Sequence, residues 1–128
     1  MSREASPKTH DMIKLQREKT YKISGNNPNV TFELPHTLQP KDSSMLVFEL
    51  YCAKNNEPFQ LQFLWRSKDG SFIEDKSVQF TTYPGITAID LSQFDLWAQA
   101  PDIAGVRLDI KALDACSEFT MKSFDLGK

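Results

Sequence analysis

Residues 59–66 read Phe-Gln-Leu-Gln-Phe-Leu-Trp-Arg, and this stretch decides the fold class. One set of alternating positions holds Phe, Leu, Phe and Trp, whereas the other set holds Gln, Gln, Leu and Arg. Successive side chains of a strand point to opposite faces, so this two-residue period is typical of a strand with one face on a core. We therefore predict a strand over 59–66, with Trp65 in the core and Arg66 on the opposite face.

The same two-residue period recurs along most of the chain. Residues 44–53 are apolar at both sets of positions, which predicts a strand covered on both sides. Further strands are expected over 12–17, 21–24, 30–34, 76–82, 86–91, 103–110 and 118–126. In the last of these, Met121 and Phe124 are three residues apart, which predicts a β-bulge near Lys122 and Ser123.

Turn clusters rich in Gly, Asn and Pro separate these segments, and no long segment has a convincing helical period. Eight or nine short strands with a turn about every ten residues are typical of an antiparallel β-sandwich or barrel. The sequence therefore predicts an all-β fold, with 11–128 as a single β-sandwich domain and 1–10 as a disordered lead-in, since the first ten residues show no periodicity.

The charge balance excludes some partners. The 128 residues contain 15 Lys and Arg against 17 Asp and Glu, a formal net charge of −2. Non-specific nucleic-acid binding depends on a positive field, so we expect no nucleic-acid partner. No apolar run approaches the roughly 18 residues of a membrane span, so no membrane insertion is expected.

The cysteines suggest a compartment. Cys52 and Cys116 are the two cysteines of the chain and lie far apart in the sequence. A disulfide-rich secreted fold has more cysteines, and the polar start of the chain has no secretory signal. We therefore expect two free thiols in a reducing compartment, a cytoplasmic localisation, and Cys52 as a small core residue.

The sequence offers little for catalysis. The two histidines, His10 and His36, have no second histidine or carboxylate at ligand spacing. No nucleophile elbow, Walker A or dinucleotide-binding motif occurs. Carboxylates on predicted strands are common on solvated faces, so they do not by themselves indicate a glycosidase. We therefore predict that the chain is not an enzyme.

A few polar and aromatic residues are candidates for sugar recognition, which uses planar aromatic surfaces together with fork-like donors and acceptors. The candidate ligand-binding residues are Trp97, Arg66, Arg107, Asp109 and Tyr83. Alternatives stay open: Arg107 and Asp109 form a cross-strand ion pair with Arg66 or Glu49, and Trp97 plugs the end of the sandwich.

Three motifs carry a resemblance to a known family. They are Leu61-Gln62-Phe63-Leu64-Trp65-Arg66, then Asp69-Gly70-x-Phe72-x-Glu74 followed by Ser77, and finally Val106-Arg107-Leu108-Asp109-Ile110. In this order they resemble the β-sandwich accessory modules of bacterial glycosyltransferases and other cell-surface glycan enzymes. The third motif usually reads Leu-Arg-Ile-Asp-Pro in that family, so this chain departs from it at Val106, Leu108 and Ile110. The similarity covers roughly residues 30–126.

The resemblance implies a galactose-binding-like jelly roll that is similar to carbohydrate-binding modules. It implies a non-catalytic accessory module that binds a glycan or oligosaccharide beside a glycan-synthesis or glycan-modifying enzyme, such as a larger glycosyltransferase polypeptide. Many such sandwiches hold a structural calcium ion, for which Asp125 is a candidate ligand; no other cofactor is expected. The alternative is a structural or protein-interaction domain without a sugar ligand, because each motif residue also has a plausible packing role.

Overall fold

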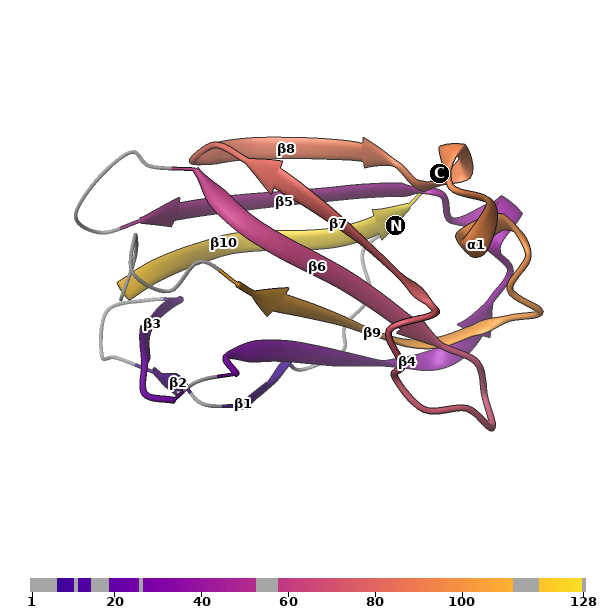
Figure 1. The fold of residues 1–128 in the computed structure, drawn as a ribbon, viewed down its shortest axis with the longest axis horizontal. Coiled ribbons are helices and arrows are strands. Elements are labelled where there is room, and N and C mark those ends of the chain that lie inside the picture. The colour runs from indigo at the N-terminus through magenta and orange to yellow at the C-terminus, as the bar shows by residue number, and fades with distance from the viewer. Residues whose placement is uncertain are drawn as a thin grey trace.

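The computed structural model describes residues 7–10, 12–14, 19–25, 27–52, 58–111 and 118–127, and it arranges them as two antiparallel sheets packed face to face (Figure 1). The first, which we call the β6 sheet, has the order β1 (Pro7–His10), β4 (Asn29–Leu38), β9 (Ile103–Ile110), β6 (Phe59–Arg66) and β7 (Ser77–Thr82). The second, the β5 sheet, has the order β2 (Met12–Lys14), β3 (Thr20–Ile23), β10 (Glu118–Gly127), β5 (Met45–Cys52) and β8 (Gly85–Asp90). The predicted antiparallel jelly-roll sandwich is confirmed.

The inner faces of the two sheets form the core. On β6 the side chains of Leu61, Phe63 and Trp65 are fully buried, as the alternation predicted. On β5 the buried positions are Leu46, Phe48 and Leu50, whereas the alternate positions are only half-buried. The expectation that β5 is covered on both sides is therefore wrong, because its second face is an outer surface of the sandwich.

The predicted bulge in the last strand is confirmed. The pairing of β10 with β5 shifts register between Met121 and Ser123, opposite Leu50 and Glu49. The extra residue lets Met121 and Phe124 both reach the interior despite their spacing of three.

The structure corrects two expectations, one about the N-terminal residues and one about Cys52. Residues 7–10 were expected in a disordered lead-in, yet they form β1 and pair with Asn29–Leu38 through four registered positions. Cys52 was expected as a free thiol, but it is disulfide-bonded; Cys116 lies outside the described residues. Disulfides persist in oxidising compartments, so this bond argues against the predicted cytoplasmic localisation.

Short helical turns close one end of the sandwich, and β6 and β7 are joined there by residues 67–76, which we call the strap. The turns are η1 (Pro40–Asp42), η2 (Leu91–Gln93) and α1 (Asp95–Ala98). In Figure 1 the strap hangs from the right-hand ends of β6 and β7, on the front of the β6 sheet. No helix among the described residues is long and apolar enough to cross a membrane.

Candidate ligand-binding site

The outer face of the β6 sheet carries an ion pair that crosses a strand. Arg66 on β6 and Glu33 on β4 both lie opposite Gly105 of the intervening β9. The Arg66 guanidinium donates through Nη2 to Glu33 Oε1 and through Nη1 to the Ser67 carbonyl at 3.2 Å. Because Gly105 has no side chain, the pair closes above β9: a Cβ at Gly105 would lie 3.1 Å from Glu33 Oε2 and 3.2 Å from Arg66 Nε.

A second arginine is fixed next to the first. Arg107 and Asp109 are two residues apart on β9, so their side chains share this face. Arg107 Nε donates to Asp109 Oδ1 at 2.7 Å, and Nη2 donates to Oδ2 at 3.0 Å. The Asp109 side chain is only 3% exposed, whereas that of Arg107 is 25% exposed. The buried carboxylate therefore holds the guanidinium in one orientation while part of it stays accessible.

The strap adds an aromatic ring and a carboxylate to this face. The Phe72 ring centroid lies 5.9 Å from Arg66 Cζ and 5.4 Å from Arg107 Cζ, within the range of cation–π contacts. Glu74 accepts a hydrogen bond of 2.7 Å from Gln62 Nε2, whose residue pairs with Asp109. We call Arg66, Arg107, Phe72 and their carboxylate partners Glu33 and Asp109 the arginine cluster.

The strap itself is tied down at both ends. Lys68 N donates to Asp102 Oδ1 at 2.8 Å, and Ser67 Oγ donates to the Asp102 carbonyl at 3.0 Å. Near the other end, Ser77 Oγ donates to the Glu74 carbonyl at 2.8 Å. These bonds position Phe72 over the two guanidinium groups without help from a ligand.

The structure brings together three of the five predicted ligand-binding residues: Arg66, Arg107 and Asp109. The alternative in which Arg107 and Asp109 pair across strands with Arg66 or Glu49 is wrong, because the two residues pair with each other along one strand. Sequence reasoning did not select Glu33 or Phe72 as candidates. The signal for Phe72 was available, since the residue belongs to the Asp-Gly-x-Phe-x-Glu motif.

Trp97, predicted as a stacking residue, is corrected. Its side chain is fully buried, and its Nε1 donates to the Pro40 carbonyl at 3.2 Å. It packs edge-on against Trp65, with ring centroids 5.2 Å apart. A ring with no accessible face cannot stack on a sugar, so Trp97 is the plug at the end of the sandwich.

Tyr83 and Asp125 lie away from the arginine cluster. Tyr83 is 71% exposed in the turn between β7 and β8, which lies at the Phe59 end of β6, opposite the end that carries Arg66. The seven residue steps along β6 span about 23 Å. Asp125 lies on β10 opposite Val47, in the other sheet. Among the described residues, no three or more His, Cys, Asp or Glu side chains gather where they could hold a metal ion.

The outer face of the β5 sheet carries a smaller polar group. Tyr51 Oη donates to Glu49 Oε2 at 2.5 Å, and Lys122 Nζ lies 5.2 Å from the Tyr51 ring centroid. The hydrogen bond to the carboxylate raises the pKa of the Tyr51 phenol, with burial and the negative charge of Glu49 acting in the same direction. In this group the described residues place one lysine over one aromatic ring, whereas the arginine cluster places two guanidinium groups around Phe72.

Comparisons with known proteins support the fold. No protein-family model matches the chain, and no curated protein sequence matches it. Among solved structures it is similar to the family 11 carbohydrate-binding module from Clostridium thermocellum, solved with a β-1,3-1,4-mixed-linked tetrasaccharide; the TM-score is 0.58 at 12% identity, over 96% of this chain and 83% of that chain. It is also similar to the enzymatically active domain of tailspike protein 4 from bacteriophage CBA120, with a TM-score of 0.50 at 9% identity, over 99% of this chain but only 18% of that chain. At these identities the similarity concerns the fold, so the chain shares its two-sheet sandwich with a carbohydrate-binding module.

Proposed function

We propose that this chain is a non-catalytic carbohydrate-binding module whose ligand lies on the outer face of the β6 sheet, at the arginine cluster. The observation that carries the proposal is the pair of guanidinium groups fixed around Phe72 by Glu33 and Asp109. Sugar hydroxyls need directed donors, and the C–H face of a pyranose needs a planar apolar surface. Because the cluster is held by its own hydrogen bonds, a ligand need not order these side chains on binding.

The pairing of the carboxylates supports a binding role over a catalytic one. Glycoside hydrolysis uses two carboxyl groups, of which one is a general acid. Glu33 and Asp109 are instead each held by an arginine. Their task in the proposal is to orient the guanidinium groups.

The resemblance of the three sequence motifs to glycan-enzyme modules extends the proposal to a biological role. The module would hold a bacterial glycan beside an enzyme that builds or modifies it, such as a glycosyltransferase polypeptide. The disulfide at Cys52 supports action outside the reducing cytosol. The similarity to a module solved with a mixed-linked tetrasaccharide makes β-1,3-1,4-mixed-linked oligosaccharides the first probes to use.

Calorimetric titration of the full chain tests the proposal, with β-1,3-1,4-mixed-linked oligosaccharides and a panel of bacterial polysaccharides. We expect a saturable heat with at least one of them, and Arg107→Ala should weaken it about tenfold or more because a charge-assisted donor is lost. Lys41→Ala, which removes an exposed cation from η1, is the matched control and should bind as the native chain does. If the folded protein binds none of the panel at millimolar sugar, the proposal fails and the structural or protein-interaction alternative stands.

A further inference from the structure

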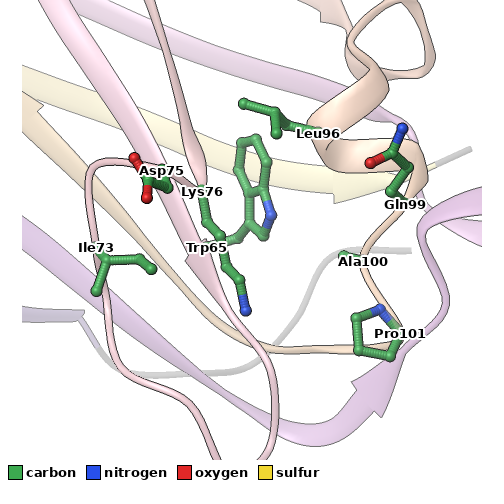
Figure 2. Close-up of a pocket in the computed structure, with 8 residues that line it drawn as sticks. All are labelled: Trp65, Ile73, Asp75, Lys76, Leu96, Gln99, Ala100 and Pro101. Atoms are coloured by element: carbon green, nitrogen blue, oxygen red, sulfur yellow. The ribbon is translucent and has the colours of Figure 1, made fainter.

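A cleft of about 330 Å³ lies at the end of the sandwich, between the strap and the α1 segment (Figure 2). Trp65 forms its floor, the strap contributes Ile73 and Lys76, and the α1 segment contributes Leu96 and Pro101. Ile73 and Leu96 are 46% and 48% exposed, unusually high values for large apolar side chains. The volume is at the small end of the range for small-molecule sites.

This cleft is distinct from the arginine cluster, although the same strap serves both. Phe72 and Glu74 contact the outer face of the β6 sheet. Ile73 and Asp75, which alternate with them, line the cleft. Residues 73–76 form a turn, which the hydrogen bond from Lys76 N to the Ile73 carbonyl closes at 3.0 Å. Residues of one strap therefore line two separate sites.

The floor of the cleft presents an indole donor without a partner. Trp65 is fully buried, and its Nε1 has no hydrogen-bond acceptor among the residues that the structure describes. Trp97 Nε1, in contrast, donates to the Pro40 carbonyl at 3.2 Å. Buried donors are nearly always paired, so a water or a ligand oxygen is expected to accept from the Trp65 N–H.

Lys76 brings a positive charge to the same place. Trp65 N donates to the Lys76 carbonyl at 3.2 Å, which continues the pairing of β6 with β7 and sets the two side chains next to each other. Figure 2 shows the carbon stem of Lys76 beside the Trp65 side chain, with the amine extending past the indole between Ile73 and Pro101, and the Asp75 carboxylate directed away from both. Within the described ranges, no carboxylate forms a salt bridge with Lys76, so its charge is open to a ligand.

We propose that this cleft is a second ligand site, which takes a carboxylate-bearing pyranose such as a uronic acid residue. Ile73, Leu96 and Pro101 supply apolar walls for the ring, while the Lys76 ammonium and the Trp65 N–H bind the carboxylate. The choice of a sugar rests on the proposed function; the choice of a carboxylate rests on the two unpartnered donors alone. The site makes the module selective for an acidic glycan.

The two tryptophans provide the readout, since each gives one indole N–H resonance in a ¹H–¹⁵N spectrum and both can be assigned by through-bond spectra without a variant. We expect glucuronate to shift the Trp65 indole resonance saturably at millimolar concentration. The Trp97 resonance, whose donor is already bonded, should stay in place. Glucose should shift the Trp65 resonance at least about tenfold more weakly, because it lacks the charge-assisted bond.

Lys76→Met should weaken the glucuronate response about tenfold or more, whereas Lys68→Met, the matched loss of a strap lysine outside the cleft, should leave it unchanged. A Trp65 resonance that no sugar moves, an equal response to glucose, or a response that survives Lys76→Met would each overturn this site. Arg107→Ala separates the two proposals. If Arg107→Ala no longer binds neutral glycans but keeps the glucuronate-induced shift, both sites are supported. If the native protein binds no neutral glycan but shows the glucuronate-induced shift, only the cleft is supported.

Discussion

Gly105 is the residue on which the arrangement of Arg66 and Glu33 depends, and Gly105→Ala tests it with a single methyl group. The new Cβ would lie 3.1 Å from Glu33 Oε2 and 3.2 Å from Arg66 Nε, so the ion pair must move by a few tenths of an ångström. The backbone itself accepts the change, because among the described glycines only Gly85 has a positive φ. The perturbation therefore acts on the ion pair and not on the strand.

Two opposing effects on stability are similar in size. Replacing glycine by alanine at a compatible position stabilises by about 0.4–1 kcal/mol, since the unfolded chain loses freedom. The ion pair is partly exposed, at 21% for Arg66 and 41% for Glu33, so it contributes about 0.2–1 kcal/mol. We expect the free energy of unfolding to change by less than about 0.5 kcal/mol. Ligand affinity should fall about fivefold, because a displaced guanidinium loses roughly 1 kcal/mol of its bond to the ligand.

Urea denaturation and calorimetric titration measure the two quantities on the same samples. Gly70→Ala is the control, since a Cβ there meets only ordinary contacts of 3.6 and 3.7 Å with Ser67 backbone atoms. Unchanged affinity in Gly105→Ala would show that Arg66 does not touch the ligand. A stability loss above about 2 kcal/mol would show that the ion pair cannot adjust, which contradicts the reasoning above.

Three further predictions concern stability. Asp109→Asn should lower the free energy of unfolding by about 1–2 kcal/mol in urea, because Arg107 loses a buried charged partner but remains a quarter exposed; an unchanged midpoint would contradict this. Cys52→Ser should lower it by about 2–4 kcal/mol, and reductant should then have no further effect. Burial raises the pKa of the Tyr21 phenol, so the folded state holds that proton more tightly, and the associated stability is present below about pH 10 and lost as pH rises through the raised value. Tyr21→Phe should flatten the loss of stability between about pH 9 and about pH 11, and equal slopes would refute the assignment.

The strands were predictable because their signal is local. Each strand that lines the core repeats apolar residues every second position, and the repeat identifies its inner face. Trp65 was assigned to the core for this reason, and it is fully buried. The bulge in β10 was visible for the same reason, since Met121 and Phe124 break the repeat by one residue.

Features that depend on contacts between residues far apart in the sequence leave no local hydrophobic pattern. Strand β1 (Pro7–His10) is an edge strand whose partner is β4, and its own four residues carry no hydrophobic alternation. The disulfide at Cys52 likewise depends on a contact that spacing alone does not reveal. The Asp-Gly pair at 69–70 is typical of a tight hairpin turn with a positive φ, yet neither residue has one, because the strap is a long tethered connection.

The candidate site was predicted in part, because a residue type indicates which bonds a side chain can form but not which distant residue it meets. Arg66 and Arg107 were selected because arginine on a strand offers fork-like donors, yet Glu33 lies 33 residues away with all of β9 between it and Arg66. The environments of the two aromatic residues outside the strands were likewise not predictable from residue type. Trp97 and Phe72 both lie in irregular segments, and only the three-dimensional path of each segment decides which ring plugs the core and which one faces the guanidinium groups. The strap turns at Gly70 and again at Lys76, so its residues meet two different environments, and a loop of this kind is where both candidate sites of this chain lie.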